Sequence, residues 1–180
     1  KSINIRQRRF FIKKMRAVRV VCVMMSSFTS CEKKDDSNTL DIFYLNIDAT
    51  ATVPEKYELK GSDESVDKQV DELLDKLSSK PDDSKLRKTI PDDVEIKKHE
   101  ENAYSCTIDF SKSYYDMTAA EEVLMRASVV RTLTQLKQIT YVMFTVDKAP
   151  LMNSDGEVIG SMNADDFVEN PGEQINSSVK

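Results

Sequence analysis

The chain contains one histidine, His99, so any chemistry that requires an imidazole must use this residue. Its neighbours are Lys97, Lys98, Glu100 and Glu101. A structural zinc site typically takes several histidine or cysteine ligands. A serine hydrolase holds its nucleophile at a sharp turn flanked by glycines, and no serine in the sequence has that setting. The sequence therefore predicts that His99 is an exposed residue at a strand end, without a metal site or a catalytic triad.

Carboxylates are the second group that could do chemistry, and three adjacent pairs stand out: Asp82-Asp83, Asp92-Asp93 and Asp165-Asp166. Adjacent side chains do not converge on one atom unless the fold brings other groups near, so we interpret these pairs as solvated loop charge. Weak calcium binding is the alternative. Residues 153–156 resemble part of a calcium loop, but Leu151 and Met162 occupy its first and twelfth ligand positions and cannot coordinate calcium. The sequence predicts no catalytic residue, no metal ligand and no cofactor.

The three cysteines have different expected roles. Cys22 lies in a segment that we expect to be removed. Residues 28–31, Phe-Thr-Ser-Cys, resemble a bacterial lipobox, with Phe28 where leucine is usual. In such a motif Cys31 becomes the first mature residue and carries the lipid, and several acyl chains anchor a protein stably where one does not. The alternative is an ordinary signal peptide with a chance cysteine. Cys106 lies in a strand-like alternation, so we expect a buried, unreactive thiol rather than a nucleophile.

The beginning of the chain has the order of a secretory signal peptide. Residues 1–19 are basic, residues 20–25 are apolar, and small residues follow. The apolar stretch is too short to cross a bilayer as a helix, which takes about 20 residues. We predict a signal peptide over residues 1–30, with Met15 as a candidate true start, and a polar tether over residues 31–38. The alternatives are a helix on the membrane surface and a mistranslated upstream extension.

The net charge of −5 conceals an asymmetry between this segment and the rest of the chain. Residues 1–20 carry eight basic side chains and no acidic one, which leaves 18 basic against 31 acidic residues, a net charge of −13, in residues 21–180. An acidic body of that size repels phosphate backbones, so we expect no nucleic-acid partner. The length allows one domain with short flanking segments.

The body of the chain alternates between strand and helix patterns. Residues 40–45 are rich in β-branched and aromatic side chains and predict a strand, whereas the polar residues 46–64 predict a long loop. Residues 66–77 have one apolar helical face. Residues 94–98 and 104–110 alternate around a polar turn at 100–102 and predict an antiparallel hairpin.

A second helix is predicted from a capping box that joins Thr118 and Glu121 and is expected to end at Gln138. Its predicted apolar face consists of Ala120, Val123, Leu124, Ala127, Val130 and Leu133. Residues 141–146 form a nearly unbroken run of bulky side chains, which predicts a strand inside a sheet. Residues 153–156 predict a turn between two short edge strands.

These elements predict an α+β domain over residues 39–168 in the order β-α-β-β-α-β, with two helices packed on one face of a mixed sheet and a C-terminal hairpin. The polar residues 169–180 are expected to form a disordered tail.

Several of these segments together resemble the GerMN domain of sporulation and spore germination proteins. The matching stretches are residues 43–46, 86–94, 107–111, 121–136 and 142–147. Two positions depart from the family pattern, because Lys148 stands where the family often has glycine and Arg131 where it often has asparagine. The resemblance implies a Gram-positive, often spore-forming source, frequent lipoprotein anchoring, and an architecture similar to the ring-building domains of secretion and sporulation channels. It carries over no catalytic residue.

Two functions remain open on the sequence. The first is a non-enzymatic module outside the cytoplasm, anchored to the cell membrane by lipid, that docks other envelope proteins or itself. The second is a hydrolytic or ligand-binding lipoprotein that acts on cell-wall material, with a cleft formed by residues 46–64 or 147–166. The complete small fold without convergent catalytic groups favours the first.

Overall fold

The computed structural model describes residues 38–153 and 155–167, which all belong to the second of the two units into which the chain divides, residues 37–180. The predicted signal peptide, the predicted lipidation site Cys31, most of the predicted tether and the predicted C-terminal tail lie outside the described residues. Within the described part of the chain, no helix has the length and apolar composition needed to cross a membrane.

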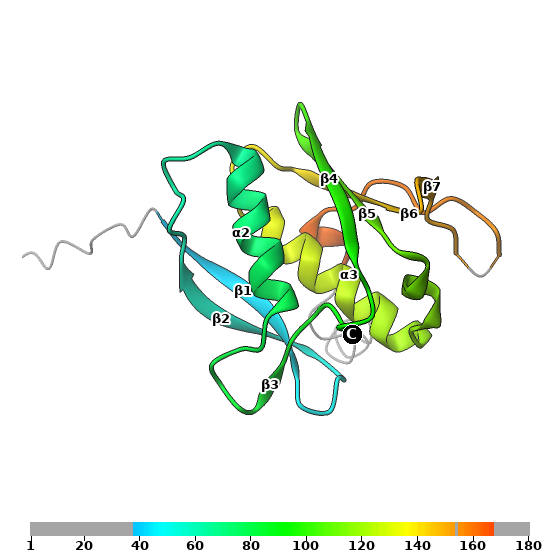
Figure 1. Cartoon of the computed structure of the whole chain (residues 1–180), viewed down its shortest axis with the longest axis horizontal. Helices are drawn as coiled ribbons and strands as arrows, with labels where there is room; N and C mark the ends of the chain where they lie inside the picture. The colour runs from blue at the N-terminus through cyan, green and yellow to red at the C-terminus, as the bar shows by residue number, and fades with distance from the viewer. Residues whose placement is uncertain (1–37, 154, 168–180) are drawn as a thin grey trace, which may run out of the picture. The chain divides into compact units, whose positions relative to one another are not determined.

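The described residues form an α+β fold, as the sequence predicts (Figure 1). In chain order its elements are β1 (Thr39–Asn46), β2 (Thr52–Glu58), α2 (Val66–Ser78), β3 (Leu86–Arg87), β4 (Ile96–Asn102), β5 (Ser105–Phe110), η1 (Lys112–Asp116), α3 (Ala119–Leu133), β6 (Tyr141–Val146), β7 (Ala149–Pro150) and η2 (Ala164–Asp166).

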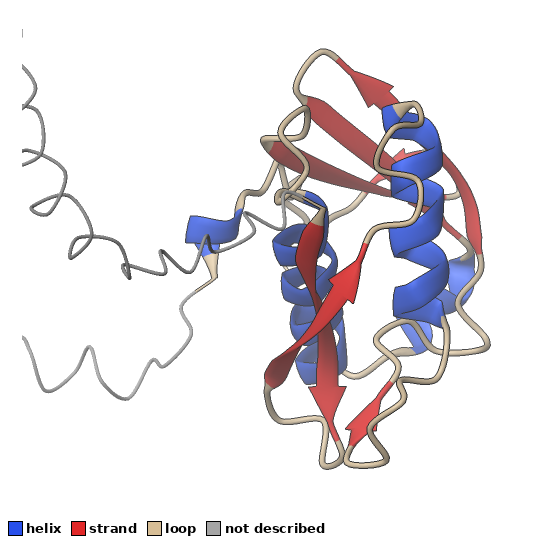
Figure 2. Cartoon of the chain, turned by 90° about the vertical axis from the view of Figure 1, so that its left-hand side faces the viewer, coloured by secondary structure: helices blue, strands red, loops and turns tan. Residues whose placement is uncertain are grey.

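The strands form two sheets and not the one mixed sheet that the sequence predicts. The first has the order β2-β1-β3 and is antiparallel, and the second has the order β4-β5-β6-β7 and is mixed, with β5 and β6 parallel. Both helices contact strands of both sheets: α2 contacts β1 and β4, and α3 contacts β1, β2 and β6 (Figures 1 and 2). The two helices therefore join the sheets.

The sheets stay separate because side chains occupy the edge of β1 that faces away from β2. The backbone N–H of Phe43 donates to Thr132 Oγ1 of α3 at 3.1 Å, and its carbonyl accepts from Thr89 Oγ1 at 2.9 Å. Gln135 bonds the backbone of Asp41 at the same edge. Buried backbone polar groups need partners, and here side chains supply them where a neighbouring strand would in one continuous sheet.

The prediction of a long loop over residues 46–64 is wrong, because β2 lies within it and pairs with β1 along its whole length. Pro54 lies opposite Phe43 in the β1–β2 ladder. The backbone N–H and carbonyl of Phe43 point toward the edge of β1 away from β2, where they bond Thr132 and Thr89. A proline is tolerated there because β2 is an edge strand and Pro54 has no ladder bond to make. The segment's polar composition reflects a strand with an exposed outer side.

The predicted hairpin is confirmed as β4 and β5, but residues 100–102 belong to β4. The turn falls at Ala103 and Tyr104, where Ala103 has a φ of +55°. The predicted strand over residues 141–146 is confirmed as β6, which lies inside its sheet between β5 and β7.

Helix α3 begins as predicted, since both bonds of the capping box between Thr118 and Glu121 are present. Its predicted apolar face is partly wrong: Ala120 and Val123 are exposed. From Met125 to Leu133 every residue except Arg131 is buried, because β1 and β2 cover one side of the helix and β6 the other. The helix ends at Leu133 and not at Gln138.

Candidate functional site

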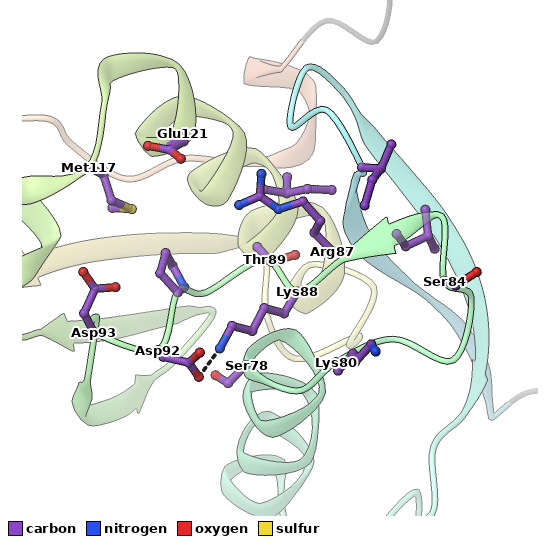
Figure 3. Close-up of a pocket in the computed structure, with 14 residues that line it drawn as sticks. Ser78, Lys80, Ser84, Arg87, Lys88, Thr89, Asp92, Asp93, Met117 and Glu121 are labelled. Atoms are coloured by element: carbon purple, nitrogen blue, oxygen red, sulfur yellow. Dashed lines mark ion pairs between the residues drawn. The ribbon is translucent and has the colours of Figure 1, made fainter.

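An open groove of about 870 Å³ lies between the segment around β3 and the start of α3 (Figure 3). We call it the β3 groove. Its apolar lining residues are Leu45, Ile47, Leu86, Pro91 and Met117; its cations are Lys80, Arg87 and Lys88; its anions are Asp92, Asp93 and Glu121. Apolar side chains and charges of both signs thus share one concave surface, a composition that suits a polypeptide segment.

The segment after α2 forms one wall of the groove, and backbone bonds fix it to the core. Asp83 closes a turn by accepting from the amide of Lys85, and it also accepts from Leu86 through its carbonyl. The amides of Thr89 and Ile90 both donate to the carbonyl of Leu77 at the end of α2. The Thr89 hydroxyl also donates to the Phe43 carbonyl of β1, so hydrogen bonds tie this wall to both α2 and β1.

The charges of the groove are partly paired. Figure 3 shows Lys88 reaching toward Asp92, with which it forms an ion pair. Bonds from the Thr118 amide and hydroxyl, with a smaller effect of Arg87, hold the pKa of Glu121 below its usual range. Within the described residues, Lys80 and Arg87 form no ion pair.

The acidic pairs singled out in the sequence do not converge on a common point. Asp92 forms an ion pair with Lys88, and the Asp83 carboxylate accepts the hydrogen bond that closes the turn before β3. Asp166 accepts from the amide of Asn163 and caps the short helix η2. The structure thus assigns local structural roles to one member of each pair.

The turn predicted at residues 153–156 is confirmed. Asn153 Oδ1 accepts from the amides of Asp155 and Glu157, and Met152 bridges Val158 across the turn. These backbone donors occupy the side-chain oxygen that a calcium loop would direct at an ion, so the turn has a structural explanation.

The prediction that His99 is exposed is wrong, because its side chain retains only 11% exposure. Nε2 lies 2.7 Å from Asp71 Oδ1 and Nδ1 lies 2.8 Å from Glu101 Oε1, with Asp67 Oδ1 3.9 Å from Nδ1. Both ring nitrogens face carboxylate oxygens, an arrangement that favours the protonated ring because each nitrogen can then donate a hydrogen bond. Burial acts against this charge, but the hydrogen bonds to Asp71 and Glu101 raise the pKa of His99.

Sequence reasoning missed this cluster because its members lie on separate elements. Asp67 and Asp71 are one turn apart on α2, and His99 and Glu101 are two residues apart on β4. The local signals were present, since i and i+4 share a helix face and i and i+2 share a strand face. Only the packing of α2 on β4 brings the two pairs together.

Cys106 is fully buried, as its strand pattern predicts. It stands opposite Glu101 in the β4–β5 ladder. Burial, with the negative charges of Glu101 and Asp67, raises the pKa of the thiol to about 12. Since the thiolate is the reactive form, Cys106 is not an activated nucleophile.

The loops expected to form a cleft for a cell-wall enzyme contribute little to the β3 groove and instead line smaller hollows in the described part of the chain. In the β3 groove, only Ile47 comes from residues 46–64 and none of the lining residues comes from residues 147–166. A smaller hollow beside the β6–β7 turn is lined by Lys97, Lys112, Asp109 and Asp147, among others, and Asp147 forms ion pairs there with both lysines. We find no nucleophile paired with a base in either hollow.

Two sheets, two helices and an open groove define a small α+β domain. The family model for sporulation and spore germination, Germane, matches residues 41–152, and the chain belongs to this family. The resemblance to GerMN domains drawn from the sequence is therefore confirmed.

Solved structures support the fold. The first GerMN domain of the sporulation protein GerM from Bacillus subtilis is 17% identical, with a TM-score of 0.56 over 72% of this chain and 98% of that one. The tandem GerMN domains of the same protein are 18% identical, with a TM-score of 0.53 over 72% of this chain and 47% of that one. This chain therefore spans about half of the tandem structure. A putative lipoprotein from Clostridium perfringens is 15% identical, with a TM-score of 0.49 over 71% and 88% of the two chains. No curated protein matches the chain.

Proposed function

We propose that this chain is a non-enzymatic lipoprotein, anchored to the outer face of the cell membrane through Cys31, whose Germane domain docks another envelope protein during sporulation or germination. The family description supports the process, and the lipobox-like residues before Cys31 support the anchor. The β3 groove is the observation that carries the docking role.

The composition of the groove favours a protein partner over a small substrate. Leu45 and Leu86 form a buried apolar floor, and Ile47 at the rim is 56% exposed. Arg87 and Lys80 flank this floor without ion pairs to described residues. An apolar anchor surrounded by unpaired cations fits a segment that combines an apolar side chain with acidic ones.

Site-specific photo-crosslinking in living cells tests this role. A photo-reactive amino acid replaces Ile47 in the full chain, and in a matched variant it replaces Tyr104, which is 69% exposed at the β4–β5 turn. We expect a discrete crosslinked partner from position 47 and none from position 104. Adding Arg87→Glu to the position-47 variant should reduce the yield of that product severalfold.

Equal products from positions 47 and 104, or none from position 47 at any stage of growth, would count against docking through the groove. A deletion strain complemented by the parent chain or by the Arg87→Glu chain then tests the process. The parent should restore sporulation and germination, and the variant should restore them less well.

A further inference from the structure

Five polar side chains gather where α2 packs on β4, and none of them lines the β3 groove. We call them the α2–β4 cluster: Asp67, Asp71, His99, Glu101 and Cys106. A ring nitrogen of His99, a carboxylate oxygen of Glu101 and Sγ of Cys106 all lie within 4.8 Å of one another. The β4–β5 hairpin supplies three of these groups, and α2, which lies earlier in the chain, supplies the two aspartates.

We propose that the α2–β4 cluster binds one divalent cation of the zinc type through His99 Nδ1, Glu101 and Cys106 Sγ, with the fourth position open to water or to Asp67, whose Oδ1 lies 3.9 Å from Nδ1. Nitrogen, sulfur and oxygen ligands in a set of four are typical of tetrahedral zinc. Calcium and magnesium prefer oxygen ligands alone, so the imidazole and the thiol select against them.

The contacts of the imidazole decide which nitrogen would bind the cation. Nδ1 faces Glu101 at 2.8 Å and Asp67 at 3.9 Å, whereas Nε2 faces only Asp71, at 2.7 Å. Histidines that bind metals commonly donate their other ring N–H to a carboxylate, which fixes the tautomer. Asp71 already stands in that position and leaves Nδ1 to the cation.

The charge of the cluster is the second argument. Three carboxylates face a single imidazole ring, so at least two negative charges remain in excess even when the ring is protonated. Within the described residues, no lysine or arginine pairs with Asp67, Asp71 or Glu101. The thiol lies beside these carboxylates, since Cys106 stands opposite Glu101 in the β4–β5 ladder. A divalent cation would neutralise the excess charge inside a partly buried site.

Binding is a simple exchange of protons for metal. His99 loses the proton on Nδ1 and Cys106 loses its thiol proton, and bonds from the cation to Nδ1 and Sγ form in their place. The two protons go to solvent, and no electron is transferred. Asp67 is exposed at the outer side of the cluster and gives the cation a path of entry.

The test uses the full chain with Cys22→Ser and Cys31→Ser, so that Cys106 is the only thiol. Titration with zinc should show one tight site. Titration with cobalt should add the near-ultraviolet absorption of a thiolate–cobalt bond, which Cys106→Ser abolishes. Asp71→Ala should weaken zinc binding 10- to 100-fold through loss of the ring's hydrogen bond.

Glu101→Gln and Glu100→Gln form a matched pair, because these neighbours lie on opposite faces of β4. Glu101→Gln should weaken zinc binding at least tenfold, and Glu100→Gln should leave it unchanged. If Cys106→Ser fails to fold by circular dichroism, the cobalt absorption of the parent and the exposed variant Asp67→Asn decide the question. Absence of zinc binding, absence of the thiolate absorption, or equal affinity in Glu101→Gln and Glu100→Gln would overturn the proposal and leave the cluster as an ion-pair clamp.

Discussion

The side-chain amide of Gln135 bonds both backbone groups of Asp41, a residue 94 positions earlier in the chain. Gln135 Oε1 accepts from the Asp41 N–H at 2.8 Å, and Nε2 donates to the Asp41 carbonyl at 2.7 Å. The side chain thus replaces one residue of a neighbouring strand. Together with Thr132 and Thr89 it closes the edge of β1, and an open edge of this kind would invite pairing with another chain.

Gln135→Ala should therefore lower the free energy of unfolding by about 0.5–1.5 kcal/mol, because two backbone hydrogen bonds lose their partner at a site that water can reach. Urea denaturation followed by circular dichroism measures the change. Gln138→Ala is the matched control, since Gln138 is exposed in the same turn, and it should change stability little. Equal stability of the two variants would contradict the role assigned to Gln135.

The turn between β6 and β7 contains two residues in the left-handed region, Asp147 at φ +50° and Lys148 at φ +67°. The amide of Lys148 donates to Asp109, so the backbone is held in this conformation. Side chains with a Cβ are disfavoured there. Glycine, which the family often has after this aspartate, removes the strain.

Lys148→Gly should accordingly raise the free energy of unfolding by about 0.5–1 kcal/mol, since the relief of strain exceeds the added entropy of the unfolded chain. Lys148→Ala removes the same charge without relieving the strain, and thermal denaturation of the two variants separates these effects. A glycine variant no more stable than the alanine variant would show that the turn is not strained.

Glu72 anchors the connection between β2 and α2. Its carboxylate accepts from the Tyr57 hydroxyl and from the amides of Lys60 and Gly61. Partial burial opposes ionisation, but these hydrogen bonds hold the pKa of Glu72 below its ordinary value of 4.5. The folded state thus binds a proton less readily than the unfolded state, and the stabilisation is present above pH 4.5 and lost as pH falls through the folded pKa.

The difference in unfolding free energy between the parent and Glu72→Gln should therefore be largest above this pH and shrink as the solution becomes more acidic. Urea denaturation at a series of pH values measures it. Glu58→Gln changes an exposed carboxylate at the end of β2 and should alter the unfolding free energy little. A difference that stays constant or grows on acidification would have the wrong sign for this account.

The sequence predicts best the elements that can be recognised from their own residues, such as a helix with one face in the core and the other in water. Helix α2 has an apolar face that carries Val70, Leu73 and Leu77 and a polar face in water, so its period is visible and its start at Val66 is correct. Strand β6 is recognised by its bulk, and the start of α3 by a local bond between Thr118 and Glu121. These signals need no knowledge of distant residues.

The remaining elements depend on long-range packing. Strand β2 carries Pro54 and charged residues because only β1 pairs with it, so its sequence resembles a loop. Buried polar residues such as Thr132 lie on α3 because β1 needs hydrogen-bond partners there, which blurs the apolar period. The environment of His99 depends on α2 meeting β4, which neither segment reveals alone.

The measurement that tests the account most directly is mass spectrometry of the mature protein isolated from its own membranes. We predict a chain that begins at Cys31 and carries covalently bound acyl groups, and a Cys31→Ser chain that is released from the membrane or left unprocessed. Recovery of the parent chain from the cytosol, without acyl groups and with the residues before Cys31 intact, would contradict the proposed function.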